Sequence, residues 1–323
     1  MDIETACGKF IDHCQSSKNL SSHTLRAYKV DLKDFGSFCG ATKALNLCDK
    51  AIIRSYLGHL QEERQLKSTT VKRRLACLKV MFRWLEDEEL IDTDPLYRLN
   101  ARIVLPKRLP KTLSRNEIGT LLIHCRNMAG WPACKDRKEK FAGKENLNNF
   151  TSLVAVEILF ATGIRVGELV SISINDIDLS TGTIIINGKG NRQRLVFITD
   201  SEILEMLEAY QERKTGTLIK TKAFLINTRG NRTSTALIRK LITQAAEKAK
   251  IQRRTTPHML RHTAASHLLR AGVDIRYVQQ LLGHHSISTT QIYTHVSDSQ
   301  LKNIISSLHP RRDILEGMIS ISD

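Results

Sequence analysis

The sequence predicts a mainly α-helical protein of two domains: an all-helical N-terminal domain and a mixed α+β C-terminal domain with a small antiparallel sheet. Three observations lead to this fold class. Apolar residues recur at helical spacing along most of the chain, and prolines and basic residues interrupt that pattern at residues 101–112. Two β-rich runs also flank a glycine-rich turn around residue 190. We therefore expect domains at residues 1–104 and 113–323, joined by a linker at residues 105–112.

The N-terminal domain is expected to consist of helices separated by short polar breaks. Residues 21–24 start a helix that runs to about Cys39, and further helices begin near Asp49 and Ser68. In the helix from Ser68, apolar residues recur at steps of three and four: Val71, Leu75, Leu78, Phe82 and Leu85. Basic residues occupy its other positions: Lys72, Arg73, Arg74, Lys79 and Arg83. Such a basic face fits the phosphates of a nucleic acid, although a stripe that only faces solvent is the commoner arrangement.

The predicted linker is basic and cannot form a continuous helix. Pro106 and Pro110 bar the helical conformation. Its basic residues, Arg102, Lys107, Arg108 and Lys111, suit a tether that wraps around a polyanion. Ser114 and Glu117 then have the spacing of a capping box, which predicts the first helix of the second domain.

The C-terminal domain combines helices with a hairpin. We expect a helix over residues 150–161, preceded by a polar surface loop at residues 128–148. Residues 183–187 and 193–198 predict two strands that pair through the turn at residues 188–191. Helices follow from about residue 200 to residue 307, with a short strand at residues 223–226. Near the C-terminus, residues 297–308 predict an amphipathic helix with Leu301, Ile304 and Ile305 on one stripe and Leu308 in register.

Charge and composition narrow the class of function. The 323 residues include 49 Lys and Arg against 33 Asp and Glu, which gives a net charge of +16. Most of this excess lies in the second domain, and it favours an anionic partner such as nucleic acid. The acidic, polar N-terminus is unlike a signal peptide, and no apolar run has a membrane-spanning length. The seven cysteines form no C-x-x-C pair, so we expect free thiols, no zinc site and a cytoplasmic location.

Two basic residues stand in positions that suit phosphate contacts. Arg165, in the segment TGIRVGEL, opens a helical turn after a glycine, with Glu168 as its nearest acidic neighbour. Its guanidinium could bind a phosphate, or it could form a purely structural ion pair. Lys189 lies between two glycines at the hairpin turn, where it could enter a groove. A solvated turn lysine is the equally plausible alternative, and the spacing does not match a nucleotide-binding P-loop.

Two further segments add histidines and a tyrosine. In HMLRH, Thr256 and Pro257 predict a helix start that places His258 in the first turn and Arg261 on the same face. An anion would be attracted to this helix terminus. His284 follows a predicted helix-ending glycine, and Tyr293 comes nine residues later. Taken singly, such histidines and tyrosines are usually structural, and no H-E-x-x-H motif indicates a metal.

Together and in this order, TGIRVGEL, GKGNRQR, HMLRH and LLGHHSISTTQIYTHV resemble the tyrosine recombinases, the integrase family that includes Xer recombinases and phage integrases. The spacings agree as well, with 24 residues from Arg165 to Lys189 and 26 from His258 to His284. The likeness spans nearly the whole chain. It implies a SAM-like, core-binding N-terminal domain, a catalytic C-terminal domain and a Xer-like tail at residues 309–311.

The resemblance also implies a role for each residue of the set. Tyr293 would be the nucleophile that forms a 3′-phosphotyrosyl bond, and Lys189 would protonate the leaving 5′-oxygen. His258 would handle or position a proton. The expected donors to the non-bridging oxygens are Arg165, Arg261 and His284. No metal, nucleotide or other cofactor is expected.

The implied partners are a double-stranded recombination site and three further copies of the chain. A homotetramer would hold two sites and exchange strands through a Holliday junction, with a partner recombinase or accessory protein left open. The helix at residues 297–308 is expected to dock into a neighbouring protomer, or alternatively to pack on its own domain. A type IB topoisomerase that relaxes DNA, a DNA-binding regulator that never cleaves, and a metal-dependent nuclease are the competing functions.

Overall fold

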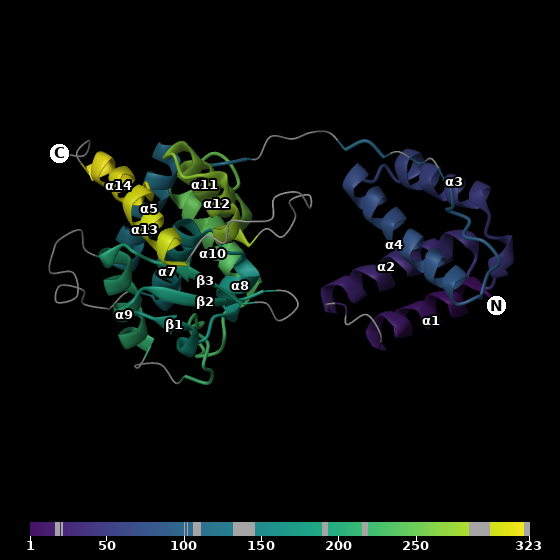
Figure 1. Cartoon of the computed structure of the whole chain (residues 1–323), viewed down its shortest axis with the longest axis horizontal. Coiled ribbons are helices and arrows are strands. Elements are labelled where there is room, and N and C mark those ends of the chain that lie inside the picture. Colours follow the sequence, from purple (N-terminus) through teal and green to yellow (C-terminus); the bar gives the residue numbers. More distant parts are fainter. Residues whose placement is uncertain are drawn as a thin grey trace. The chain divides into compact units, whose positions relative to one another are not determined.

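The computed structural model describes most of the chain as two units. The described residues are 1–16, 20, 22–99, 101, 103–105, 111–131, 146–188, 193–214, 219–283 and 298–319. The chain divides into Met1–Arg108 and Leu109–Asp323, so the boundary falls inside the predicted linker (Figure 1). Each unit has its own hydrophobic core.

The described part of the N-terminal unit consists of helices joined by turns and short extended segments. Its α-helices are α1 (Ile3–Ser16), α2 (Ser22–Cys39), α3 (Lys50–Gly58) and α4 (Ser68–Asp87). A short 3-10 turn, η1 (Leu45–Leu47), and a π-helical turn, η2 (His59–Glu63), flank α3. The predicted helix starts are confirmed: the Asp49 side chain caps α3 by accepting from the Ile52 amide, 2.9 Å away. Both α1 and α2 pack against α4.

The C-terminal unit surrounds one buried helix. Its helices are α5 (Arg115–Ala129), α7 (Leu147–Thr162), α8 (Val166–Ser171), α9 (Ser201–Lys214), α10 (Thr235–Lys248), α11 (Pro257–Arg270), α12 (Ile275–Leu282), α13 (Asp298–Leu308) and α14 (Arg311–Ile319). The helices α5, α9, α10 and α11 all contact α7. Because α7 is enclosed, every residue from Phe150 to Thr162 is buried, which explains its almost uninterrupted apolar sequence.

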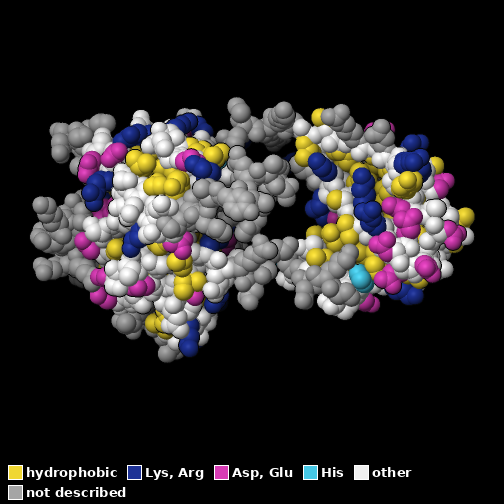
Figure 2. All heavy atoms as spheres, viewed as in Figure 1, with side chains coloured by type: hydrophobic (Ala, Val, Ile, Leu, Met, Phe, Trp, Pro, Cys, Tyr) yellow, Lys and Arg dark blue, Asp and Glu magenta, His cyan; other side chains and the backbone are white. Residues whose placement is uncertain are grey.

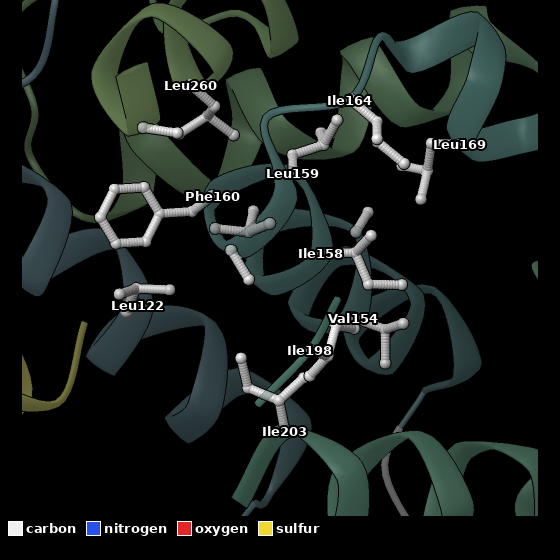
Figure 3. Packing of buried hydrophobic residues seen from close by; sticks show 14 of the residues in the cluster. Leu122, Val154, Ile158, Leu159, Phe160, Ile164, Leu169, Ile198, Ile203 and Leu260 are labelled. Atoms are coloured by element: carbon white, nitrogen blue, oxygen red, sulfur yellow. The ribbon is translucent and has the colours of Figure 1, made fainter. Parts of the chain in front are cut away.

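The core around α7 is packed from several sides. Figure 3 shows Ile158, Leu159 and Phe160 of α7 among side chains of neighbouring elements, including Leu122 of α5 and Leu260 of α11. All five of these side chains are fully buried. The core therefore fixes the end of α7, from which the chain turns into α8.

Within the described residues, the sheet has three antiparallel strands in the order β1–β2–β3. They are β1 (Ile177–Asp178), β2 (Thr183–Asn187) and β3 (Gln193–Phe197), preceded by a short 3-10 turn, η3 (Ile174–Asp176). Asn187 pairs with Gln193, so the hairpin predicted from the glycine-rich turn is confirmed. The sequence reasoning did not identify β1.

The strand predicted at residues 223–226 is wrong. This apolar run is buried, but among the described residues its β pairing is limited to two isolated bridges, from Ala223 to Ser173 and from Ile226 to Arg232. The Phe224 amide donates to the Ile172 carbonyl, 2.9 Å away. Its neighbours are turns and helix ends, which offer no extended partner for a continuous ladder.

The C-terminal helices pack on their own domain in this chain. In α13, Leu301 and Ile305 are buried in the core, and Lys302 donates to the Thr181 carbonyl at 2.6 Å. This arrangement is the alternative to docking in a neighbour; exchange of α13 between protomers stays a prediction. In α14, the buried Arg311 donates to Glu157 on α7 at 2.7 and 2.9 Å.

Within the described part of the chain, no helix combines the length and the apolar character needed to span a membrane. The same residues contain no group of three or more histidine, cysteine, aspartate or glutamate side chains arranged to hold a metal ion. No disulfide bond joins the cysteines among these residues: Cys7, Cys14, Cys39, Cys48, Cys77 and Cys125.

Candidate active site

A left-handed glycine positions Arg165. The helix α7 ends at Gly163, which has φ +63° and donates its amide to the Leu159 carbonyl at 3.0 Å. Ile164 of the turn and Leu169 of α8 are both buried in the core (Figure 3). These anchors leave Arg165 as the N-terminal cap of α8, with its side chain 51% exposed.

Glu168 holds the backbone and the guanidinium of Arg165. One carboxylate oxygen accepts from the Arg165 amide at 2.8 Å, and the other accepts from Nη1 at 3.0 Å. Burial alone would raise the pKa of Glu168, but hydrogen bonds and charge from Arg194 and Arg165 outweigh it and lower the pKa. The carboxylate is therefore ionised at neutral pH, and Arg165 is restrained while half of its side chain stays accessible.

Arg261 lies behind the same turn and is buried. Its Nη1 donates to the Gly163 carbonyl at 2.8 Å and its Nη2 donates to the Leu282 carbonyl at 2.7 Å. Burial, followed by the charge of Arg165, lowers its pKa to about 10, so Arg261 remains protonated at neutral pH. The guanidiniums of Arg165 and Arg261 thus both lie at the turn that follows Gly163, an arrangement that favours binding of an anion.

His258 occupies the first turn of α11, as the sequence predicts. The Thr256 side chain caps the helix by accepting from the Met259 amide at 3.2 Å, and Pro257 is the first helical residue. The His258 ring is exposed, and its Nε2 lies 2.9 Å from Nε2 of His262. One imidazole must donate to the other, so this contact restricts the tautomers of both rings.

Lys189, His284 and Tyr293 lie outside the described residues. The structure does describe the elements that flank them. The strand β2 ends at Asn187 and β3 begins at Gln193, on either side of the turn with Lys189. Gly283, with φ +67°, ends α12 immediately before His284. Of the predicted catalytic residues, the structure thus brings together Arg165 and Arg261, and places His258 one helical turn before Arg261 on α11.

Sequence reasoning gave Arg194 no role. This arginine of β3 donates to both carboxylate oxygens of Glu168, at 3.1 and 2.8 Å, and to the Leu281 carbonyl at 3.3 Å. The only signal in the sequence was its position in the segment GKGNRQR, five residues after Lys189. Its partners are distant in sequence, so no local pattern connects them.

The predicted DNA-binding face of α4 is partly exposed and basic. Lys72, Lys79 and Arg83 are exposed, and Figure 2 shows Lys and Arg side chains over α4 in the N-terminal unit. Arg73 is also exposed, but it is paired with Asp31 on α2. These four side chains are accessible to a ligand.

The prediction that Arg74 faces DNA is wrong. Its side chain is 8% exposed, and it pairs with Asp34 and lies 3.3 Å from the Tyr56 hydroxyl. Arg74 is three residues after Val71 and four before Leu78, so it shares the apolar stripe that packs against α2. It acts as an internal ion-pair partner, as expected for a buried charge.

The linker residues Arg102, Lys107 and Arg108 lie outside the described part of the chain, whereas Lys111 is described and exposed. Lys111 lines a cavity of about 610 Å³ together with Lys250 and Arg253. The Arg253 side chain is fixed by Glu117 of α5 at 2.9 Å and donates to the Thr112 carbonyl at 3.1 Å. A basic concavity therefore lies at the start of the C-terminal unit.

Comparisons with known proteins cover both units. The model of the phage integrase N-terminal SAM-like domain matches residues 8–89, and that of the phage integrase family matches residues 136–300. A tyrosine recombinase of Agathobacter rectalis is 33% identical over 315 residues, which cover 97% of this chain and 98% of that protein. Tyrosine recombinase XerD of Staphylococcus saprophyticus is 34% identical over 317 residues, 96% of this chain and all of that protein.

A solved structure has the same fold. The post-cleavage complex of the XerH site-specific recombinase with a palindromic difH substrate matches with a TM-score of 0.67 at 22% identity. The match covers 98% of this chain and 84% of that protein. At this identity the likeness concerns the fold alone.

Proposed function

This chain belongs to the phage integrase family of tyrosine recombinases, and we propose that it cleaves and rejoins duplex DNA at a specific site through a covalent bond to Tyr293. The observation that carries the proposal is the pair of guanidiniums at the Gly163 turn. Arg165 is held by Glu168 with an accessible side chain, and Arg261 is held by two carbonyls. Fixed cations of this kind are preorganised donors for the non-bridging oxygens of a phosphodiester.

In the proposed reaction, the phenolic oxygen of Tyr293 attacks the phosphorus of one phosphodiester. A bond forms between this oxygen and phosphorus while the bond from phosphorus to the 5′-oxygen breaks. Lys189 gives a proton to the leaving 5′-oxygen, and His258 accepts or positions the proton that leaves Tyr293. The products are a 3′-phosphotyrosyl bond and a free 5′-hydroxyl.

Electrostatics supports these roles. A free tyrosine has a pKa of about 10, so attack by the phenolate needs neighbouring positive charge. Loss of one preorganised donor typically costs about 3–4 kcal/mol, or 10²–10³ in rate. The covalent bond retains the energy of the phosphodiester, so that a 5′-hydroxyl from another strand can attack it and reseal the DNA without a nucleotide.

The number of strands sets the proposed assembly. Exchange between two duplexes requires four cleavages, one by each Tyr293, and therefore four protomers. Exchange of one pair of strands before the other creates a Holliday junction. In this assembly we propose that α13 transfers to a neighbour, because every copy carries the same surface on which Leu301 and Ile305 now pack.

The proposal is tested by trapping the covalent intermediate. Footprinting on the DNA that flanks the gene first identifies a bound site. A duplex of that site with a nick beside the scissile phosphate then loses a short fragment after cleavage, which prevents religation. We expect the wild-type protein to accumulate on this DNA in a denaturing gel, whereas Tyr293→Phe does not.

Other results would identify the competing functions. A footprint without a covalent complex in the wild type would favour a regulator that does not cleave. Relaxation of plasmids that lack the site would favour a topoisomerase. A covalent complex that persists in Tyr293→Phe would refute the assignment of the nucleophile.

A further inference from the structure

Arg194 joins three elements of the active site. Its side chain is largely buried, at 17% exposure, and extends from β3 toward α8 and α12. Both terminal nitrogens donate to the carboxylate of Glu168, at 3.1 and 2.8 Å, and Nε donates to the Leu281 carbonyl at 3.3 Å. A planar guanidinium can make these contacts at once, whereas a lysine ammonium cannot reproduce a two-point contact with a carboxylate.

The contact with Glu168 affects Arg165. Glu168 is shared by two guanidiniums, because the same two oxygens also accept from the Arg165 amide and Nη1. With Arg194 present, this group of three side chains carries one net positive charge. Without Arg194, the negative charge of Glu168 would cancel the positive charge of Arg165, and the pair would have no net charge. Glu168 would then compete with a phosphate for the Arg165 guanidinium.

The contact with Leu281 affects the end of α12. The last carbonyls of a helix have no donors within the helix. Arg194 satisfies the Leu281 carbonyl and Arg261 satisfies the Leu282 carbonyl at 2.7 Å. Gly283 lies directly against Arg194, since an added Cβ would be 3.1 Å from Cζ of that guanidinium. His284 is the next residue, so Arg194 fixes the backbone from which it starts.

We propose that Arg194 is a positioning residue for DNA cleavage. It holds Glu168 so that Arg165 keeps its charge and direction for the phosphate, and it anchors the end of α12 ahead of His284. This inference rests on the proposed function, because it assigns Arg194 to the cleavage step. Arg194 acts through other residues and does not itself contact DNA.

The test separates cleavage from binding. Single-turnover formation of the covalent complex is measured on the nicked duplex at saturating protein, and DNA affinity is measured separately. We expect Arg194→Ala to slow complex formation about 10- to 100-fold. This loss is smaller than the roughly 10²–10³-fold effect of removing a direct donor, because Arg194 acts through other residues. The DNA affinity of Arg194→Ala should stay within about twofold of the wild type. The cleavage rate of Arg194→Lys should lie between those of the wild type and Arg194→Ala.

A matched control is Arg232→Ala. Arg232 is also an arginine beside α8, but it is exposed and donates to the Ser171 carbonyl at 3.5 Å, at the opposite end of the helix from Arg165. We expect its cleavage rate to equal that of the wild type. A loss as large as that of Arg194→Ala would overturn the specific role of Arg194.

A double-mutant cycle with Glu168→Gln identifies the route. If Arg194 acts by compensating the charge of Glu168, the loss from Arg194→Ala must shrink in the Glu168→Gln background. If the rate reductions of Arg194→Ala and Glu168→Gln simply multiply in the double variant, Arg194 does not act through the charge of Glu168. Thermal unfolding of the same four proteins is measured alongside, and a rate loss that persists while all four remain folded at the assay temperature is not a stability defect.

The failures of the two proposals can be told apart. If the wild type forms no covalent complex, the proposed function is wrong. If the wild type cleaves and Arg194→Ala cleaves equally fast, only the role of Arg194 is wrong. Should Arg194→Ala not fold, the folded Arg194→Lys decides the matter, because a wild-type rate in that variant shows that the two-point contact is not needed.

Discussion

The guanidinium of Arg261 donates to the carbonyl of Gly163, 98 residues earlier in the chain, at a distance of 2.8 Å. This contact joins α11 to the turn between α7 and α8. Because the same guanidinium also reaches the Leu282 carbonyl, one buried cation connects three of the segments that carry the predicted catalytic residues. The described part of the candidate active site is thus anchored to the core of the C-terminal unit.

Gly163→Ala is expected to disturb this junction. Gly163 has φ +63°, and an added Cβ would lie 2.7 Å from Cδ2 of Leu282. The left-handed conformation alone costs an alanine about 1–2 kcal/mol, and the close contact adds to this. Thermal unfolding should show the loss. Gly167→Ala in α8, where no atom lies within 4 Å of the added Cβ, should leave stability unchanged or slightly increased.

Arg165→Ala and Arg261→Ala should differ in stability although both impair cleavage. Each removes a proposed donor to the phosphate, so we expect covalent complex formation to fall about 10²–10³-fold. Arg165 is half exposed, and its loss should hardly change the melting temperature. Arg261→Ala leaves two buried carbonyls without their donor, at about 1–3 kcal/mol each. Equal melting temperatures would contradict the buried role of Arg261.

The basic residues of α4 should separate into two classes. Lys79→Ala and Arg83→Ala are expected to weaken DNA binding and to reduce the salt dependence by about one phosphate each. Unchanged affinity and salt slope in Lys79→Ala would contradict a DNA contact on this face.

Arg74→Ala should instead destabilise the N-terminal unit by about 1–3 kcal/mol, because it removes a buried charged donor that two carboxylates share. Asp34 and Asp31 on α2 would each lose one partner, while Asp34 keeps Arg64 and Asp31 keeps Arg73. Denaturant unfolding measures this loss. If Arg74→Ala were as stable as the wild type and its DNA affinity depended less on salt, Arg74 would contact DNA as first predicted.

The free energy of unfolding of the C-terminal unit should fall as the pH is lowered from neutrality, because this unit buries His309. Burial lowers the pKa of His309 to about 4, below the unfolded value of about 6.5. Between about pH 4 and pH 6.5, His309 therefore binds fewer protons in the folded state than in the unfolded state. The stability that neutral His309 contributes is fully present above pH 6.5 and is lost as the pH falls to about 4. His309→Gln should flatten this part of the stability–pH curve. An unchanged curve would show that other groups cause the decline.

Local signals predicted most of the fold. Caps lie within a few residues of the helices they start, which is why Asp49, Ser114 and Thr256 mark the observed helix starts. The β-rich run and the glycine-rich turn beside it predicted the limits of β2. The strand predicted at residues 223–226 was wrong because an apolar run indicates burial, and only tertiary structure decides whether a strand partner lies beside it.

The candidate site was predictable where residues share a short motif. Arg165, His258 and Arg261 stand in such motifs, and their order carried the resemblance. Arg194 was missed because its partners are remote: Glu168 is 26 residues away and Leu281 is 87. Arg74 was misplaced for the same reason, because its carboxylate partners lie on another helix. Burial of a charge depends on partners that a helical pattern alone does not reveal.

The most direct test of the account is to locate the covalent bond. The trapped complex is digested with nuclease and protease, and the peptide that retains a nucleotide is sequenced by mass spectrometry. We expect a single modified residue, Tyr293, linked through a 3′-phosphate. A nucleotide on any other residue, or cleaved DNA with a free 3′-phosphate and no attached peptide, would contradict the central claim.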